Sequence, residues 1–399
     1  MSDETIMPFD FQSGSPSIIK VIGVGGGGGN AVNHMYREGI HDVTFVVCNT
    51  DNQALDESPV PIKLQLGREG LGAGNRPERA RDAANESLED VKNMLNDGCK
   101  MAFITAGMGG GTGTGAAPII AKTAKDMGIL TVGVVTKPFR FEAKARMVNA
   151  ISGIERIKDN VDTLIIIPND KLLEIVDRRT TMPDALKKAD EVLQQAVQGI
   201  TDLINVPAVI NLDFADVQTV MKDKGIAHIG IGEGKGDDKA SEAVKMAVES
   251  PLLETTISGA THVIINVSGD ITLADASDAA SYVQELAGDD VNIIFGAMYD
   301  ASKTDSCKVT VIATGLVDET LPNNKTMSNM GTYANKYVKP VTPNVNLKSR
   351  PFTAPAENPM QGQVQTPVRK PAQGIINPGD IRSKVENKPL DIPGFLQKK

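Results

Sequence analysis

Two glycine-rich runs are the stretches of this sequence best suited to chemistry. They read GVGGGGGN at residues 23–30 and MGGGTGTG at residues 108–115. Backbone N–H groups that converge without side chains in the way bind phosphate groups, and threonine hydroxyls add donors with little bulk. No G-K-[ST] triplet follows either run, so neither is a Walker A loop. The two runs together predict a site for a longer polyphosphate chain.

The first run also permits a different interpretation. Gly23, Gly25 and Gly28 satisfy the dinucleotide pattern G-x-G-x-x-G, and Asp51 could then bind a ribose hydroxyl. An NAD-dependent oxidoreductase is therefore an alternative. That alternative lacks an evident catalytic His or Lys–Tyr constellation and leaves the second glycine run unexplained.

Two further patterns place charged side chains together. In NLDFAD, at 211–216, Asp213 and Asp216 lie three residues apart at a predicted helix start, where they can share a face. The same spacing is typical of an N-terminal capping box, which is the structural alternative. Glu142 and Arg146 have the i,i+4 spacing of an ordinary pair on a helix surface.

The glycine runs lie between predicted strands and helices. Strand-length apolar runs alternate with helical patterns from Ser17 to about Asp170, which predicts βαβ units and a doubly wound α/β fold. In such a fold, ligands bind at the carboxyl ends of the strands. The predicted strands are 18–25, 43–50, 101–107, 130–136 and 163–169.

A long amphipathic helix is predicted over 183–204, followed by a second α/β region over 206–317. That region has strand-like runs at 261–269, 292–299 and 308–315, and helical patterns at 238–249 and 273–287. The stretch IGIGEGKG, at 229–236, is interpreted as a loop because acidic and polar residues follow it.

Composition limits the class of protein. A formal net charge of −9 argues against nucleic acid or an anionic membrane as the main partner. The three scattered cysteines and the acidic N-terminus, which lacks a signal-peptide pattern, favour a cytoplasmic protein. Ten of the 22 prolines lie between Pro340 and Pro393, which predicts a disordered linker. Apolar residues return in the last stretch, KPLDIPGFLQKK, which suggests a docking motif.

These motifs together resemble the FtsZ family of bacterial cell-division GTPases, within the tubulin superfamily. The resemblance is carried by GGGTGTG, GVGGGGGNAV, NTD, TKPF, IPND and NLDFAD, in that family's order, and by the terminal LDIPGFL. It implies a tubulin-like fold with these parts: a flexible segment 1–16, a GTP-binding domain 17–182, a central helix 183–205, a GTPase-activating domain 206–318, a disordered linker 319–384 and a partner-binding peptide 385–399.

The resemblance implies that the chain binds GTP or GDP with Mg²⁺, whose protein ligands cannot be assigned. Asp190 is then the source of guanine specificity, and Leu186 stands where many members have phenylalanine against the base. The implied nucleotide-binding residues are Gly26, Gly27, Gly28, Gly29, Asn30, Ala73, Gly74, Gly111, Thr112, Gly113, Glu142, Arg146, Asn169 and Asp190.

Catalysis is implied to occur between subunits. The loop with Asn211, Asp213 and Asp216 would insert into the GTP site of the next subunit, which produces head-to-tail filaments and a Z ring at the division site. FtsA-like membrane-tethering proteins would bind the terminal peptide, and no nucleic acid or direct membrane insertion is expected. A tubulin-like structural protein that binds GTP without turnover is a further alternative. The implied partner-binding residues are Leu390, Asp391, Ile392, Pro393, Phe395 and Leu396.

Overall fold

The computed structural model describes residues 18–175, 179–205, 208–210, 212–249, 256–288, 290–300 and 303–316. The chain divides into two units, Met1–Ala334 and Asn335–Lys399, and every described residue lies in the first. The expected N-terminal segment, linker and terminal peptide lie outside the described residues, and so does Asn211.

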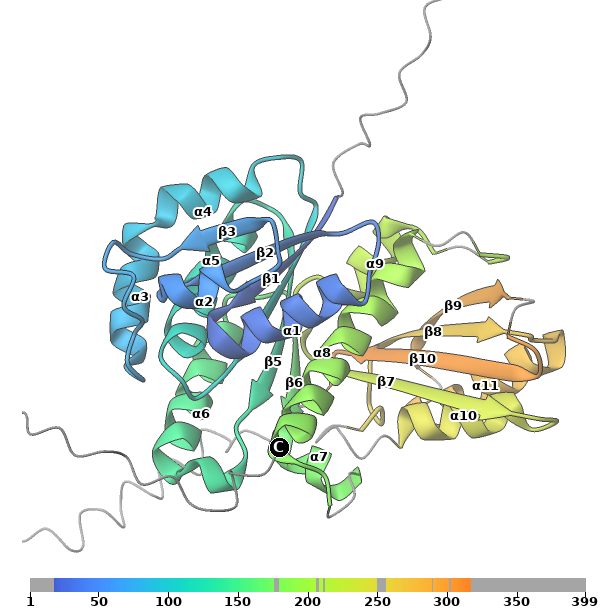
Figure 1. Ribbon diagram of the computed structural model, residues 1–399. Helices are drawn as coiled ribbons and strands as arrows, with labels where there is room; N and C mark the ends of the chain where they lie inside the picture. The colour runs from blue at the N-terminus through green and yellow to red at the C-terminus, as the bar shows by residue number, and fades with distance from the viewer. Residues whose placement is uncertain are drawn as a thin grey trace, which may run out of the picture. The chain divides into compact units, whose positions relative to one another are not determined.

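A ten-stranded sheet organises the described residues, with strand order β3-β2-β1-β4-β5-β6-β7-β10-β8-β9 (Figure 1). The strands from β3 through β7 are parallel, β10 runs antiparallel to β7 and β8, and β8 pairs in parallel with β9. The strands are β1 (Ile19–Val24), β2 (Thr44–Asn49), β3 (Ile62–Gln65), β4 (Met101–Gly107), β5 (Leu130–Lys137), β6 (Thr163–Pro168), β7 (Gly225–Lys235), β8 (His262–Gly269), β9 (Asn292–Tyr299) and β10 (Ser306–Thr314).

Helices cover both faces of the parallel part, so the doubly wound prediction is confirmed. One buried cluster joins its strands to α1 and α8, and a second joins the opposite face to α3, α4, α5 and α6. The helices are α1 (Gly25–Arg37), α2 (Asn52–Asp56), α3 (Pro77–Glu86), α4 (Leu88–Leu95), α5 (Thr112–Asp126), α6 (Lys144–Lys158), α7 (Asn169–Ile175), α8 (Met182–Asn205), α9 (Phe214–Met221), α10 (Lys239–Val248) and α11 (Leu273–Ala287), with a 3₁₀ turn η1 at Arg140–Glu142.

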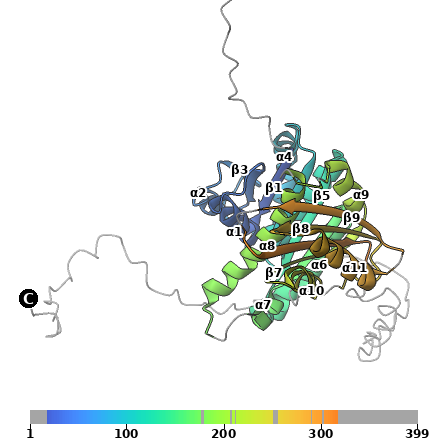
Figure 2. The ribbon, with the colours of Figure 1, turned by 90° about the vertical axis from the view of Figure 1, so that its right-hand side faces the viewer.

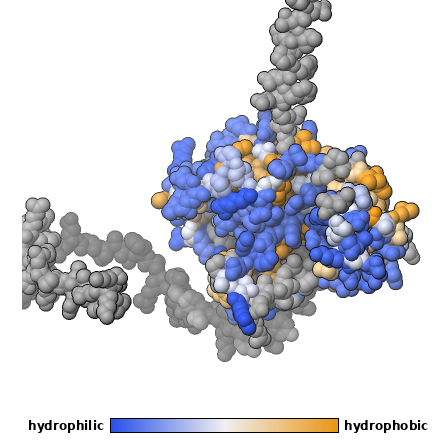
Figure 3. All heavy atoms as spheres, turned by 45° about the vertical axis from the view of Figure 1, so that its right-hand side comes forward, coloured by the Kyte–Doolittle hydropathy of each residue, from blue (hydrophilic) through white to orange (hydrophobic). Residues whose placement is uncertain are grey.

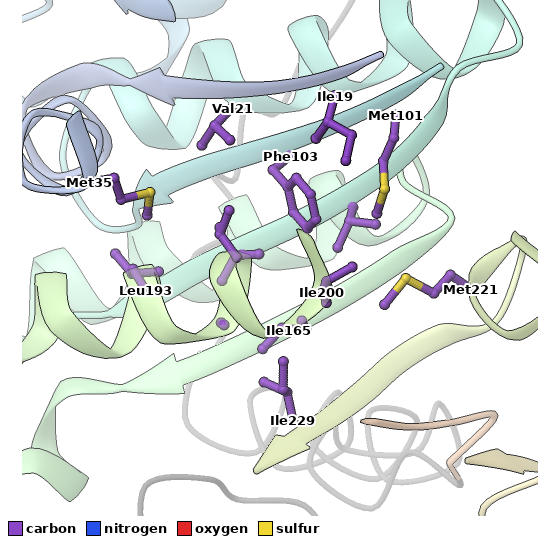
Figure 4. Close-up of a cluster of buried hydrophobic side chains, with 14 of the residues drawn as sticks. Ile19, Val21, Met35, Met101, Phe103, Ile165, Leu193, Ile200, Met221 and Ile229 are labelled. Carbon is purple, nitrogen blue, oxygen red and sulfur yellow. The ribbon is translucent and has the colours of Figure 1, made fainter. Parts of the chain in front are cut away.

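The long helix α8 joins the two halves of the sheet. Its apolar side chains pack on the parallel strands and on β7, and the core they form includes Met221 from α9 (Figure 4). The residues labelled in that view are Ile19, Val21, Met35, Met101, Phe103, Ile165, Leu193, Ile200, Met221 and Ile229. This core reaches Ile264 of β8 and Ile312 of β10, so α8 also covers one face of the second half.

The course of α8 relates the two edges of the sheet. It follows β6 and α7, and at its far end the side chain of Asn205 donates to the carbonyl of Asp42, just before β2 begins. The helix therefore runs from the carboxyl edge of the parallel strands to their amino edge. Its 24 residues span roughly 36 Å at 1.5 Å per residue.

The helices α10 and α11 pack on the other face of the second half, where Figure 2 shows them beside β7 and β8. The prediction of a loop over 229–236 was wrong, because 229–235 lie in β7, between β6 and β10. The alternating glycines let α10 approach. A Cβ at Gly230 would lie 1.7 Å from the Ala247 carbonyl oxygen, and one at Gly232 would lie 2.0 Å from that of Ala243.

Within the described segments, no helix combines the length and the apolar character needed to cross a bilayer. Hydrophilic residues cover most of the face seen in Figure 3, and hydrophobic residues gather toward the right of that view. The most exposed large apolar side chains include Leu71 and Leu273, which are 85% and 89% exposed.

Candidate functional site

Both glycine runs form starts of helices at the carboxyl edge of the parallel sheet. Helix α1 begins at Gly25, directly after β1, so the first run lies in the first turns of a helix and not in a loop. Helix α5 begins at Thr112 after a short turn that follows β4. In the described structure, no side chain caps either start. The first N–H groups of both helices are therefore free to bind an anion, which the helix dipole also favours.

The glycines of the first run have two different roles. A Cβ at Gly28 would lie 2.1 Å from the carbonyl oxygen of Thr105 in β4, so this buried glycine permits close packing of α1 on the sheet. A Cβ at Gly26 or Gly29 would meet nothing within 4 Å. Gly26, Gly27 and Asn30 are exposed. Residues 26, 27, 29 and 30 therefore form the open side of this helix start.

The second run lies against the first and against a third loop. Gly25 has a φ of +73°, and a Cβ added there would lie 2.7 Å from the backbone nitrogen of Gly113. A Cβ at Gly111 would lie 2.8 Å from the Cβ of Ala73. Gly74 follows at φ +56° and has open space around it. The structure thus brings together the three segments that the sequence predicts around the phosphates.

The two threonines of MGGGTGTG differ in their surroundings. The hydroxyls of Thr112 and Thr50 are 2.7 Å apart, at the junction of β2 and α5. The hydroxyl of Thr114 is completely buried and accepts a hydrogen bond of 2.8 Å from the Gly109 amide. Thr114 therefore stabilises the loop from inside and does not face a ligand, contrary to the prediction. Thr50 was not predicted, although its place after a strand could have indicated it.

Glu142 and Arg146 form a hydrogen-bonded ion pair beside the second run. The Arg146 Nη1 atom lies 2.6 Å from Glu142 Oε2, and the other carboxylate oxygen accepts from the Phe139 amide. A Cβ at Gly110 would lie 3.8 Å from Arg146 Nη2. The simple i,i+4 pair is thus present, and it also holds a cation against the phosphate-binding turn.

Asn169 has a buried polar atom without a partner among the described residues, and Asp190 has a carboxyl whose pKa burial perturbs. Asn169 begins α7 and is 7% exposed, and no described donor reaches its Oδ1 atom. Burial raises the pKa of Asp190 in α8 to about 7, and Glu191 adds to the rise. A ligand that supplied N–H donors would satisfy the Asn169 oxygen and favour the ionised form of Asp190. Leu186, one turn before Asp190, is half exposed.

The acidic pair lies elsewhere, at the start of α9. Asp213 Oδ1 accepts from the Asp216 amide at 2.9 Å, and Asp216 Oδ2 accepts from the Asp213 amide at 3.2 Å. The capping box considered as an alternative is therefore present, and it presents both carboxylates at the surface. Asp51 Oδ1 likewise accepts from the Gln53 amide and so caps α2. This structural role explains the aspartate at that position without a bound ribose.

The acidic pair and the glycine runs lie on opposite edges of the sheet. Helix α9 follows α8, which ends at the amino edge, and its own last carbonyl accepts from Thr163 at the start of β6. The predicted nucleotide residues lie at the carboxyl edge. One subunit therefore does not bring the two sets of predicted residues together.

Residues 18–177 match the Tubulin/FtsZ family, GTPase domain, and residues 225–317 match the FtsZ family, C-terminal domain. FtsZ of M. jannaschii, solved as an empty dimer, is 44% identical over 76% of this chain and 89% of its own, with a TM-score of 0.70. A tryptophan-to-tyrosine mutant of that protein is equally similar, at 44% identity over 75% and 91% with a TM-score of 0.70. CetZ2 from Haloferax volcanii, a GTPγS-bound protofilament, shares the fold at 20% identity over 80% and 98%, with a TM-score of 0.65.

These matches support GTP hydrolysis over the dehydrogenase interpretation and over GTP binding without turnover. The two family models cover the strands that carry both glycine runs and most of the second half of the described structure. This chain belongs to the FtsZ family of tubulin-like GTPases.

Proposed function

We propose that this GTPase assembles head to tail into filaments and that GTP is hydrolysed where two subunits meet. The observation that carries the proposal is the position of Asp213 and Asp216 at the sheet edge opposite the glycine runs. Helix α8 connects the two edges of the sheet, and its 24 residues span roughly 36 Å at 1.5 Å per residue. A nucleotide bound at α1 and α5 needs a second subunit to supply these carboxylates.

In the proposed reaction, the helix starts hold the phosphates and the acidic loop of the neighbour activates water. The free N–H groups of α1 and α5 and the Thr112 hydroxyl stabilise negative charge on the phosphates. The carboxylates of Asp213 and Asp216, with Asn211, orient the attacking water and accept its proton. The guanine base contacts Asn169 and Asp190, and Glu142 and Arg146 lie near the ribose.

Mg²⁺ fits this arrangement as an ion carried by the nucleotide. Among the described residues, no group of three or more His, Cys, Asp or Glu side chains could hold a metal. Mg²⁺ commonly keeps several waters and binds substrate phosphates, and the nearby neutral hydroxyls of Thr50 and Thr112 suit such an ion. When bound, it would neutralise charge on the phosphates.

A head-to-tail contact needs two different surfaces on each subunit. Leu71 lies in the loop before Ala73, at the nucleotide edge, and Leu273 begins α11, in the half that also carries the acidic loop. Both leucines are almost fully exposed, at 85% and 89%, which favours burial in an interface. M. jannaschii FtsZ forms a dimer, and CetZ2 forms a GTPγS-bound protofilament, which supports assembly in this chain as well.

The biological role that we propose is formation of the contractile Z ring at the bacterial division site, from the cytoplasm. FtsA-like tethering proteins would bind the terminal peptide that contains Leu390 and Phe395, and the linker 319–384 would let the filament body lie away from the membrane. The nucleotide-binding and activating domains would be 17–182 and 206–318, connected through α8.

Phosphate release from GTP with Mg²⁺, measured across protein concentration, tests the shared site. We expect the rate per subunit to rise steeply above a threshold concentration in the native chain. The Asp216→Ala variant should bind GTP with unchanged affinity and lose this rise. A rate per subunit that stays constant down to the lowest concentration would mean a self-contained active site and would overturn the proposal.

A further inference from the structure

The C-terminal end of α9 is held by polar contacts from both halves of the sheet. The hydroxyl of Thr314 in β10 donates to the Val220 carbonyl at 2.7 Å, and that of Thr163 in β6 donates to the Met221 carbonyl. Both threonines are completely buried. The last carbonyls of a helix normally lack partners, so these two bonds fix where α9 ends.

A lysine from α5 reaches the turn that follows α9. Lys125 Nζ lies 2.8 Å from Asp223 Oδ1 and 3.0 Å from the Val161 carbonyl, with Asp162 Oδ1 at 3.4 Å. Asp223 is held at φ +54°, in the left-handed region. The hydrogen bond from Lys125 lowers the pKa of Asp223, so the pair is charged at neutral pH.

These contacts connect the two parts of the proposed site through two helices. Helix α5 begins at Thr112 in the phosphate-binding turn and ends at Asp126, with Lys125 in its last turn, and its 15 residues span roughly 22 Å. Helix α9 begins at the acidic pair and ends beside Asp223, and its eight residues span about 12 Å. The helix that binds the phosphates thus holds the far end of the helix that carries the carboxylates.

We propose that Lys125 is a positioning residue for GTP hydrolysis: through Asp223 it fixes the orientation of α9, and so aims Asp213 and Asp216 at the nucleotide of the next subunit. This inference rests on the proposed function. Lys125 lies in the last turn of α5, at the end opposite the phosphate-binding turn. It acts through the tilt of α9, where a small error at the anchored end moves the carboxylates at the other end.

The pair is poorly placed to serve stability alone. The side chains of Lys125 and Asp223 are 31% and 64% exposed, and ion pairs at such positions add little to folding stability. Positioning is far more sensitive, because a displacement of about 1 Å can lower a rate by up to about a hundredfold. Turnover and stability should therefore separate when the pair is broken.

The test compares Lys125→Met, Asp223→Asn, the double variant and Lys125→Arg. Asparagine tolerates the left-handed backbone, and Asp223→Asn leaves the contact between Lys125 and Asp162 intact. Lys92→Met is the matched control, because Lys92 forms a surface pair with Glu89 at the same distance of 2.8 Å. The readouts are kcat and KM for GTP at saturating protein, the assembly threshold with a slowly hydrolysed GTP analogue, and Tm.

We expect Lys125→Met to lower kcat by about tenfold with KM and assembly threshold nearly unchanged, and to lower Tm somewhat, because it also removes the cation beside the buried Asp162. Asp223→Asn, which leaves that contact in place, should keep the native Tm. Asp223→Asn should lower kcat by a smaller factor, the double variant should be no worse than Lys125→Met, and Lys125→Arg should recover most of the rate. Lys92→Met should match the native chain. An unchanged kcat in both single variants, a double variant whose loss is the product of the two, or a fall in kcat that only follows a fall in Tm would overturn the inference. A native rate per subunit independent of protein concentration would instead refute the proposed function itself.

Discussion

Asp213 and Asp216 each accept a hydrogen bond from the other's backbone amide, at 2.9 and 3.2 Å. The same carboxylates therefore cap α9 and carry the proposed chemistry, and substitutions can separate these two roles. Asparagine caps a helix about as well as aspartate but cannot act as a base. The side chains thus need not lose their structural role when they lose their charge.

We expect Asp213→Asn and Asp216→Asn to retain the native Tm and to lose turnover by at least about a hundredfold, since general-base catalysis contributes roughly that much. Asp213→Ala should lose turnover and, in addition, about 1 kcal/mol of stability from the missing cap. Calorimetry and steady-state GTP hydrolysis measure the two effects. Native turnover in either asparagine variant would remove that carboxylate from the mechanism.

Asp190 predicts a pH dependence of nucleotide affinity. Its pKa is raised from the ordinary 3.8 to about 7 by burial, so without nucleotide the native state keeps a proton that the unfolded state loses. The stability of the nucleotide-free protein should consequently fall as the pH rises from about 4 to about 7. Guanine donors favour the ionised carboxylate, so GDP affinity should rise as the pH increases toward 7 and level off above it.

Below pH 7, GDP affinity should rise with pH by at most about tenfold per pH unit, the limit for one titrating carboxyl. Titrations with GDP between about pH 5.5 and pH 8 measure it, and the Asp190→Asn variant corrects for ionisation of the phosphate itself. The variant should bind GDP more weakly and show a flatter profile. Parallel profiles for the two proteins would show that Asp190 does not titrate against the base.

The packing of α10 on β7 predicts that one added methyl group lowers the stability of the fold strongly. A Cβ at Gly232 would lie 2.0 Å from the Ala243 carbonyl oxygen, and neither backbone can move without disturbing its strand or helix. We expect Gly232→Ala to lower the free energy of unfolding by roughly 3 kcal/mol, at the upper end of usual overpacking costs. Chemical denaturation measures it.

Gly29→Ala is the matched control, because a Cβ there meets nothing within 4 Å. In nucleotide-free protein this helical substitution should leave stability unchanged or raise it by up to about 1 kcal/mol. Equal effects of the two substitutions would contradict the close approach of α10 to β7.

The ion pair between the buried Lys20 and the half-exposed Asp97 predicts different stability losses for substitutions at its two partners. The Lys20 side chain is 2% exposed, and its Nζ atom lies 2.6 Å from Asp97 Oδ2 and donates to the Met94 carbonyl. Asp97→Ala leaves a buried cation with one partner fewer, and we expect a loss of about 1–3 kcal/mol. Lys20→Met removes the charge and should cost less. Urea denaturation compares them, and a larger loss for Lys20→Met would contradict this explanation.

Much of the fold could be predicted because its signals are local. Apolar β-branched runs indicated β1, β2, β4, β5, β6, β8, β9 and β10, and the apolar stripe indicated α8 to within a residue at each end. β7 was missed because its glycines serve contact with α10, which is distant in sequence. The short β3 (Ile62–Gln65), half exposed at the sheet edge, has no strong apolar pattern either.

The site was predictable to a similar degree. Glycine density indicated phosphate binding at Gly26 and Gly111, but spacing alone could not separate the open Gly26 from the packed Gly28. The inward turn of Thr114 and the contact between Thr50 and Thr112 depend on how two strands end side by side. The contact between Lys125 and Asp223 joins residues 98 positions apart, which no local pattern reveals.

A mixing experiment tests the central claim, that one subunit's acidic loop completes the next subunit's GTP site. Asp216→Asn keeps the nucleotide site and lacks the loop carboxylate. Gly26→Leu fills open space at the start of α1, which should block GTP while the fold and the loop remain. Each variant alone should be inactive, and their mixture should recover GTP hydrolysis that rises with the concentration of both. A mixture as inactive as its components, with both variants folded and Asp216→Asn still binding GTP, would contradict the shared site.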